Sequence, residues 1–130
     1  MQMKVLIADD EPKVRSALRL LLEQESEWQI VGEVGDAKSL FSDIQVVCPD
    51  VVLLDWELPG IDLKNRVTEL KKYCPKVKIV ALSSQVNARK TAHRAKIDRF
   101  ISKGHPPDAV LSELYSLYDC LKKENRGSVL

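Results

Sequence analysis

The sequence lacks a long apolar run, a strong excess of either charge, and a leader-like start. Its longest apolar runs, such as residues 51–54, are far too short to cross a bilayer. Residues 1–10 make a poor signal peptide, because their apolar stretch ends in two acids after a few residues. A formal net charge of +1 gives no general attraction to nucleic acid or to an anionic membrane. We therefore expect a cytoplasmic protein that contacts no membrane and does not itself bind nucleic acid.

Cysteines are also few, and their arrangement argues against a covalent framework. Cys48, Cys74 and Cys120 are widely spaced, form no Cys-X-X-Cys pair and have no nearby histidine. This pattern predicts three reduced thiols rather than a disulfide framework or a zinc site. Cys48 and Cys74 each precede a proline in matching contexts, between a helical segment and a β-rich run. A Cys-Pro pair can hold haem, but a proline that ends a helix is the simpler interpretation.

What the sequence does have is a regular alternation of strand-sized apolar runs and segments with helical spacing. The runs are mostly rich in valine and isoleucine and lie at 4–8, 28–34, 51–54, 77–82 and 99–102. Between them, apolar residues recur three and four positions apart, which is the spacing of one helix face. Pro12 and Asp36 stand where helices would begin, as a first-turn proline and an N-cap.

This alternation, without any linker rich in glycine or serine, indicates one parallel sheet covered by helices on both faces. Right-handed crossovers leave few topologies for such a chain. We therefore predict an α/β fold, flavodoxin-like and doubly wound, with five parallel strands in the order 2-1-3-4-5. The domain should span residues 1–122, and the charged segment 123–130 should be a flexible tail or the start of a linker.

The fourth helical segment, residues 85–96, has little to bury. Its apolar residues are mostly alanines, whereas its basic residues include Arg89, Lys90 and Arg94. Such thin packing predicts the helix that is most easily displaced from the sheet. The basic run is most simply a solvated face, and a partner surface is the alternative.

Polar residues follow four of the five predicted strands. They are Asp9 and Asp10 after the first strand, Asp55 after the third, Ser83 and Ser84 after the fourth, and Lys103 after the fifth. In a doubly wound sheet, ligands bind outside the carboxyl ends of the strands, near the topological switch point. Strand phase favours Ser83 at this rim, and the other serine would cap the next helix. Acids also stabilise helix N-termini and form turns, but those roles do not explain why acids, serines and a lysine all follow strands of one sheet.

The charges at this rim indicate a cation and phosphate chemistry. Two carboxylates about 4 Å apart repel by roughly 1 to 4 kcal/mol, so one stays protonated or a cation lies between them. The candidate ligands are all hard oxygens, which favours Mg²⁺ or Mn²⁺ over zinc or copper. Asp55 would then be an oxygen nucleophile, with the metal, Lys103 and the Ser83 hydroxyl neutralising an incoming phosphoryl group.

As an ordered set, these residues resemble the receiver domain of bacterial two-component response regulators, over residues 4 to about 121. The resemblance is strongest to receivers that precede a helix-turn-helix DNA-binding domain. It implies that Asp55 is the phosphoacceptor, that Lys103 contacts the acyl phosphate and that Ser83 donates to a phosphoryl oxygen. The metal site that it implies consists of the side chains of Asp9, Asp10 and Asp55 and the backbone carbonyl of Glu57.

The function implied by this resemblance is a phosphorylation switch. Asp55 would accept a phosphoryl group from a sensor histidine kinase, and the domain would catalyse both its own phosphorylation and its dephosphorylation. Phe100 matches an aromatic residue that rotates inward in active receivers, and it would move with Ser83. The face formed by the fourth helix, fifth strand and fifth helix would then change, favouring a partner or a homodimer. The basic residues expected in that contact are Arg89, Lys90 and Arg94.

Some positions depart from the family pattern without removing a catalytic side chain. Leu63, Lys96 and Arg99 stand where the family often has glycine. Gly104 replaces the proline that often follows the lysine, so no cis peptide is expected there. Glu57 occupies a position that tunes the lifetime of the phosphoryl group in the family. If the chain is a fragment of a longer protein, the implied output is transcriptional regulation.

Three other functions are compatible with parts of the pattern. A receiver fold can serve as a constitutive protein-interaction module that is not phosphorylated, although no catalytic position is missing here. A flavodoxin-type electron carrier needs a phosphate loop rich in serine, threonine and glycine after the first strand, where this sequence has acids. An aspartyl phosphohydrolase usually has a second aspartate two residues after the nucleophile and a cap domain, and the sequence matches neither.

Overall fold

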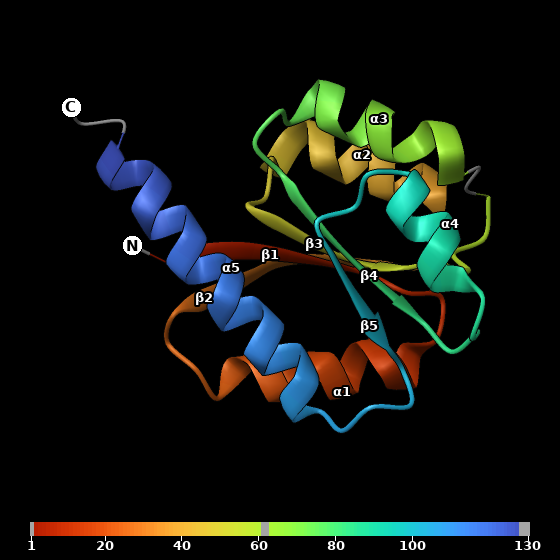
Figure 1. The fold of residues 1–130 in the computed structure, drawn as a ribbon, viewed down its shortest axis with the longest axis horizontal. Helices are drawn as coiled ribbons and strands as arrows, with labels where there is room; N and C mark the ends of the chain where they lie inside the picture. Colours follow the sequence, from red (N-terminus) through yellow and green to blue (C-terminus); the bar gives the residue numbers. More distant parts are fainter. Residues whose placement is uncertain (1, 61–62, 128–130) are drawn as a thin grey trace.

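The computed structural model describes residues 2–60 and 63–127, in which five strands alternate with five helices (Figure 1). The strands are β1 (Met3–Ala8), β2 (Trp28–Val34), β3 (Val51–Asp55), β4 (Lys78–Ser83) and β5 (Arg99–Ser102). The helices are α1 (Pro12–Glu23), α2 (Ala37–Val47), α3 (Leu63–Tyr73), α4 (Ala88–Arg94) and α5 (Asp108–Gly127). All five predicted strands are present, and their bounds differ from the prediction by no more than one residue at either end.

The strands form one parallel sheet in the order β2-β1-β3-β4-β5, which confirms the predicted fold class. Helices α1 and α5 cover one face of the sheet, and α2, α3 and α4 cover the other (Figure 1). The strand order reverses between β1 and β3, which lie side by side with Ala8 aligned with Leu54. The residues that follow these two strands therefore emerge together at the topological switch point.

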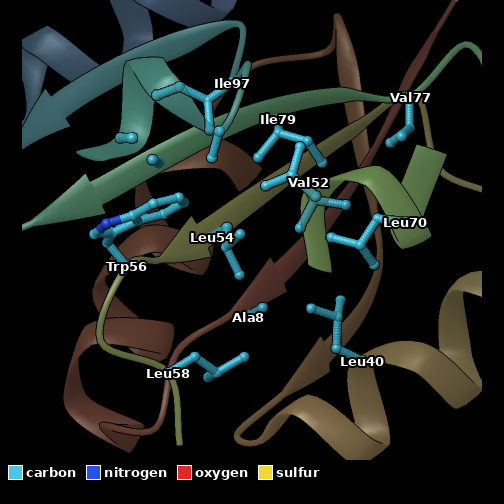
Figure 2. Packing of buried hydrophobic residues seen from close by; sticks show 14 of the residues in the cluster. Ala8, Leu40, Val52, Leu54, Trp56, Leu58, Leu70, Val77, Ile79 and Ile97 are labelled. Carbon is cyan, nitrogen blue, oxygen red and sulfur yellow. The ribbon is translucent and has the colours of Figure 1, made fainter. Parts of the chain in front are cut away.

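The sheet separates two hydrophobic cores because successive side chains of a strand point to opposite faces. Leu6 and Ala8 of β1 pack with α2, α3 and α4, whereas Val5 and Ile7 pack with α1 and α5. Figure 2 shows part of the first core, in which helix side chains such as Leu40 face the strands. Every residue of β3 is buried, which explains why its sequence is almost continuously apolar. The inner strands are thus held from both sides, and the polar residues at their ends are placed rigidly.

Two predicted helix starts are confirmed. Pro12 stands in the first turn of α1, where the missing N–H has no helical partner to lose. Asp36 is the N-cap of α2, and its Oδ1 accepts a hydrogen bond from Ser39 N–H at 2.8 Å. That hydrogen bond holds the pKa of Asp36 below its ordinary value.

Helix α4 is short, and the thin packing predicted for it is present. It covers Ala88–Arg94 within the longer predicted segment 85–96, with turns on both sides. Its buried residues are Ala88 and Ala92, and Val86 just before it is 95% exposed. The prediction that a serine after β4 caps this helix is wrong, because Asn87 occupies the N-cap position.

Helix α5 runs further than expected, since residues 123–127 continue it to Gly127. Residues 128–130, the rest of the predicted tail or linker, lie outside the described residues. The domain boundary at residue 122 stays a prediction. Within the described ranges, none of the helices, α5 included, has the length and apolar character needed to span a membrane.

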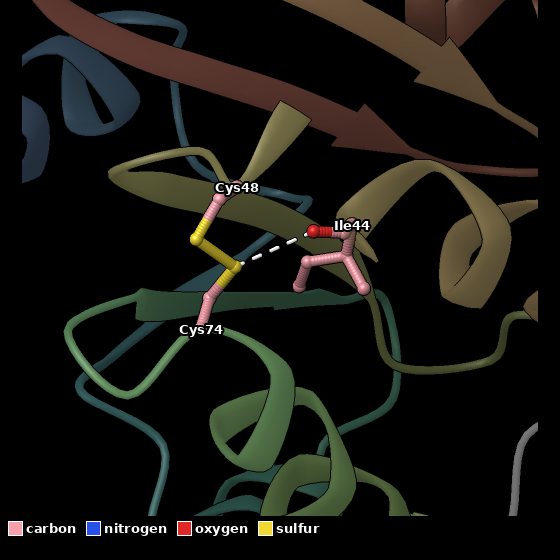
Figure 3. The surroundings of a disulfide bond; sticks show 3 residues. All are labelled: Ile44, Cys48 and Cys74. Atoms are coloured by element: carbon pink, nitrogen blue, oxygen red, sulfur yellow. Dashed lines mark hydrogen bonds between the residues drawn. A yellow bond between two sulfur atoms is a disulfide. The ribbon is translucent and has the colours of Figure 1, made fainter. Parts of the chain in front are cut away.

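Cys48 and Cys74 form a disulfide, so the prediction of three reduced thiols is wrong for these two residues (Figure 3). The reason lies in the pairing of β3 with β4, where Val51 is aligned with Lys78. The two Cys-Pro pairs precede these neighbouring strands and meet at the same edge, with a Cα–Cα distance of 5.7 Å. Cys120 is a free, exposed thiol. A cytoplasmic location stays a prediction, and the cysteine pattern no longer supports it.

Reduction of this disulfide is expected to lower the melting temperature by about 10 °C. The bond closes a loop between residues 26 positions apart, and the chain-entropy relation gives roughly 3 to 4 kcal/mol for a loop of that size. Circular dichroism melts with and without a reductant measure the shift. The double variant Cys48→Ser/Cys74→Ser should melt at the temperature of the reduced protein, and a reductant should not change that temperature. Identical melts of the oxidised and reduced protein would contradict the expectation.

Candidate functional site

Three carboxylates meet at the carboxyl edge of β1 and β3. Asp9 and Asp10 follow β1, and Asp55 is the last residue of β3. Each contributes one carboxylate oxygen to a group whose members all lie within 4.8 Å of one another. Asp9 and Asp55 are each only 2% exposed, whereas Asp10 is exposed to solvent. The structure thus brings together all three side chains that were predicted as metal ligands.

Asp9 is fixed through both oxygens of its carboxylate. Glu11 N–H donates a hydrogen bond to Asp9 Oδ1 at 2.9 Å, and Lys103 Nζ donates to Asp9 Oδ2 at 2.9 Å. The backbone is held as well, because Arg15 Nη1 donates to the Asp9 carbonyl oxygen at 2.6 Å. Asp9 is therefore preorganised, with little freedom to change its position when a ligand binds.

Lys103 reaches this cluster from the end of β5. Its backbone N–H donates to the Ser83 carbonyl oxygen at 2.8 Å, which extends the pairing of β4 with β5 beyond the strands. Its Nζ lies 2.9 Å from Asp9 Oδ2 and 3.3 Å from Asp55 Oδ1. Burial alone would lower the pKa of Lys103, but the hydrogen bond to Asp9 and the charge of Asp55 raise it above the ordinary value. The lysine is therefore held as an ammonium between two carboxylates.

The surroundings of Asp55 raise its pKa above the ordinary value. Burial raises the pKa of Asp55, and the nearby carboxylates of Asp9 and Asp10 raise it further. Two contacts lower the pKa of Asp55 but do not cancel the increase. They are the hydrogen bond from Glu57 N–H to Asp55 Oδ1, at 3.0 Å, and the charge of the Lys103 ammonium. Three acids against one ammonium leave an excess of negative charge, which a bound cation would neutralise.

The donor set fits a hard divalent cation. All three side chains offer carboxylate oxygens, two of them buried, and neither histidine nor cysteine belongs to this group among the residues that the structure describes. Oxygen ligands of this kind suit Mg²⁺ or Mn²⁺ rather than zinc or copper. The exposed position of Asp10 leaves the site open to water, which Mg²⁺ retains in its coordination shell. The cluster can therefore hold a metal ion.

Ser83 is the last residue of β4, and its side chain is already engaged by Glu57. Its Oγ lies 2.9 Å from Glu57 Oε1 and 2.8 Å from Glu57 Oε2, and it accepts a hydrogen bond from Gln85 N–H at 3.0 Å. The resemblance gave Glu57 a metal-binding backbone carbonyl and a position that tunes the phosphoryl lifetime, but the contact of its side chain with Ser83 was not predicted. An acid two residues after Asp55, beside a serine on the next strand, was the available signal. The hydrogen bond itself depends on a rotamer that no sequence pattern specifies.

The other predicted residues lie on and beneath α4. Phe100 is aligned with Ala81 of β4 and is 9% exposed, within the core that also contains the alanines of α4. The Arg89 guanidinium lies over the Phe100 ring, with its Cζ 4.8 Å from the ring centroid. Lys90 and Arg94 are exposed on the same helix. One predicted interface residue therefore contacts the predicted switch residue directly, through a cation–π interaction.

The structure shows the backbone at two positions where the sequence departs from the family pattern, Lys96 and Gly104. Lys96, which stands at a common glycine position, has a φ of 64°, in the left-handed region that favours glycine. The chain tolerates this conformation in the turn before β5 without glycine. Within residues 2–60 and 63–127, no peptide bond is cis, in agreement with the expectation for Gly104.

Comparison with known proteins identifies the family. A family model described as the response regulator receiver domain matches residues 5–115. This chain belongs to that family. The receiver is 27% identical over 129 residues to the response regulator protein VraR of Staphylococcus aureus, covering 98% of this chain and 58% of VraR. It therefore spans little more than half the length of this curated relative.

Solved structures of receivers agree with the fold. The isolated receiver domain of RcsB from Salmonella enterica serovar Typhimurium, with the phosphomimetic BeF3-, has a TM-score of 0.83 and 27% identity. The similarity covers 92% of this chain and 90% of that one. The RcsB structure bound to the promoter rprA also has a TM-score of 0.83, with 25% identity. That similarity covers 92% of this chain and 61% of the RcsB chain. The receiver thus belongs with response regulators of two-component systems.

Proposed function

We propose that this receiver accepts a phosphoryl group on Asp55 from the phosphohistidine of a sensor histidine kinase. The observation that carries the proposal is the position of Asp55, a buried carboxylate held beside Lys103 within a cluster of three acids. The residues that would hold Mg²⁺, or Mn²⁺, are Asp9, Asp10, Asp55 and Glu57 through its backbone carbonyl. When bound, this ion would supply positive charge that neutralises the phosphoryl oxygens.

The transfer is a displacement at phosphorus. The Glu57 N–H and Lys103 both contact Asp55 Oδ1, and we assign Oδ2 as the attacking oxygen. A bond forms between Oδ2 and phosphorus while the bond from phosphorus to the kinase imidazole nitrogen breaks, and the imidazole leaves with the electron pair. Lys103 stabilises the charge on the transferring group, because its ammonium is already placed beside the acceptor. Attack of water on the acyl phosphate would later return the free carboxylate.

Incubation with acetyl phosphate and Mg²⁺, followed by intact mass measurement, tests this proposal without a known kinase. We expect the wild-type protein to gain the mass of one phosphoryl group and to lose that gain when Mg²⁺ is chelated before incubation. Because the aspartyl phosphate hydrolyses, the reaction is quenched in acid at several times. A wild-type protein that is never modified in the presence of Mg²⁺ would overturn the proposal.

The signal would leave the site through Ser83, Phe100 and α4. Arg89 rests on the Phe100 ring, so an inward rotation of that ring removes the contact that fixes Arg89. Few apolar contacts oppose movement of α4, because its buried residues are alanines. Phosphorylation would in this way rearrange the basic face of α4, and we propose that this face then joins a homodimer or a partner.

Reversing the exposed charges on α4 is expected to weaken phosphorylation-dependent dimers about tenfold. The variant Lys90→Glu/Arg94→Glu replaces two cations on the proposed contact without touching the carboxylate cluster, so phosphorylation itself should persist. Sedimentation at several concentrations, with and without beryllofluoride and Mg²⁺, measures the change. Lys72→Glu/Lys76→Glu makes the same change in charge at exposed positions of α3 and the loop after it, as a control. If the two variants weaken the dimer equally, or if neither does, the α4 face is not the dimer contact.

We further propose transcriptional regulation as the output of a longer protein that contains this receiver. The support is the length of VraR, of which this chain spans 58%, and the RcsB structure bound to a promoter. The receiver itself would contribute the switch and the dimer contact rather than contact DNA.

A further inference from the structure

The Ser83 hydroxyl already has an anionic acceptor in the unphosphorylated protein. A serine hydroxyl carries one proton to donate, and here its Oγ lies 2.8 and 2.9 Å from the two carboxylate oxygens of Glu57. The Gln85 N–H donates to the same Oγ at 3.0 Å, so Oγ is an acceptor there and its own proton stays free to be donated to Glu57. Ser83 is only 1% exposed, so water has little access to compete for the proton. The contact is of the strong kind, because its acceptor is charged.

Glu57 is also tied to Asp55 through its backbone. Its N–H donates to Asp55 Oδ1 at 3.0 Å, so one residue contacts both the proposed phosphoacceptor and the serine that would donate a hydrogen bond to the phosphoryl group. The residue is exposed, so its side chain can turn toward solvent without breaking a core contact. Glu57 is therefore placed to hold Ser83 and able to release it.

We propose that the Glu57 carboxylate competes with the phosphoryl group for the Ser83 hydroxyl and so holds the receiver in its resting state. This inference rests on the proposed function, in which Ser83 donates to a phosphoryl oxygen. The hydroxyl has one proton, so a strong hydrogen bond to Glu57 leaves none for an equally strong bond to a phosphoryl oxygen, and the two negative groups would also repel each other. Glu57 must turn away before Ser83 binds the phosphoryl oxygen. Glu57 is thus a positioning residue that acts through Ser83 and opposes phosphorylation.

The proposal predicts tighter binding of a phosphoryl mimic when Glu57 is removed. Beryllofluoride with Mg²⁺ should bind Glu57→Ala about 10-fold more tightly than wild type, since no hydrogen bond to a charged acceptor has to be broken. The fluorescence of Trp56, which is buried next to Asp55, provides the signal. Glu57→Gln keeps an oxygen that accepts from Ser83 but has no charge, so its affinity for beryllofluoride should lie between those of wild type and Glu57→Ala.

A double-mutant cycle with Ser83→Ala separates competition from simple repulsion. In the Ser83→Ala background the hydrogen bond is absent, so Glu57→Ala should improve binding by only about 2-fold, which is the share due to charge. An equal improvement in both backgrounds, or none in either, would overturn the inference. If wild type does not bind beryllofluoride, or Asp55→Asn binds it equally well, the proposed function itself fails.

A second measurement needs neither metal nor phosphoryl mimic. In the ligand-free protein, Glu57→Ala and Ser83→Ala remove the same hydrogen bond, so the loss of melting temperature in the double variant should be smaller than the sum of the two single losses. Additive losses would show that the two side chains do not interact in the resting state, and would overturn the inference even if beryllofluoride binding changes.

Discussion

Asp55→Asn is expected to abolish phosphorylation by acetyl phosphate, leaving no gain in intact mass where wild type gains one phosphoryl group. An amide cannot supply the carboxylate oxygen that attacks phosphorus, so the loss should be complete rather than partial. The fold should survive, because an amide has nearly the shape of a carboxylate. Without metal, the variant should melt at a higher temperature than wild type, since burial and the neighbouring acids raise the pKa of Asp55 and disfavour its charged form.

The matched control for this prediction is Asp119→Asn, the same substitution at an exposed position on α5. It should be phosphorylated as fast as wild type. Modification of Asp55→Asn at the wild-type level would show that another group takes the phosphoryl, and the assignment of Asp55 would be wrong. A protein that is unmodified in every form, yet binds the same partners, would instead favour the constitutive interaction module.

Lys103→Met is expected to slow phosphorylation by roughly 10²- to 10³-fold, the usual cost of removing one preorganised charge from a reaction centre. It should also destabilise the metal-free protein by about 2 to 4 kcal/mol, because two buried carboxylates lose their shared cation. Lys103 Nζ lies 2.9 Å from Asp9 Oδ2 and 3.3 Å from Asp55 Oδ1. Time courses with acetyl phosphate measure the first effect, and urea unfolding measures the second.

Mg²⁺ should restore part of the lost stability in Lys103→Met, since a bound cation replaces some of the missing positive charge. Lys123→Met, at an exposed position near the end of α5, is the control and should change neither property. A normal phosphorylation rate in Lys103→Met would remove this lysine from the mechanism. If Lys103→Met loses stability but is phosphorylated at the normal rate, Lys103 serves only to balance the charge of the two carboxylates.

The sequence predicted the fold well because its periodicities are unambiguous. Runs rich in valine and isoleucine, bounded by helical spacing, located every strand to within one residue at either end. The carboxylate site followed from topology, since parallel strands bring their carboxyl ends to one edge. Asp9, Asp55 and Lys103 therefore lie together although the first and the last are 94 positions apart in the sequence.

Other features depend on contacts that periodicity does not encode. The Cys48–Cys74 bond required the register of β3 on β4, with Val51 aligned with Lys78. Composition alone favoured reduced thiols. The hydrogen bonds between Glu57 and Ser83 depend on side-chain rotamers, and the short extent of α4 depends on how few of its residues find a partner in the core.

The most direct test of the central claim is to locate the phosphoryl group on the chain. After reaction with acetyl phosphate and Mg²⁺, borohydride reduction converts an aspartyl phosphate into homoserine, and tandem mass spectrometry reads the position of the change. We predict homoserine at position 55 and intact aspartate at positions 9 and 10. Homoserine at either of those two positions, or its absence from a protein that has gained phosphoryl mass, would contradict the account.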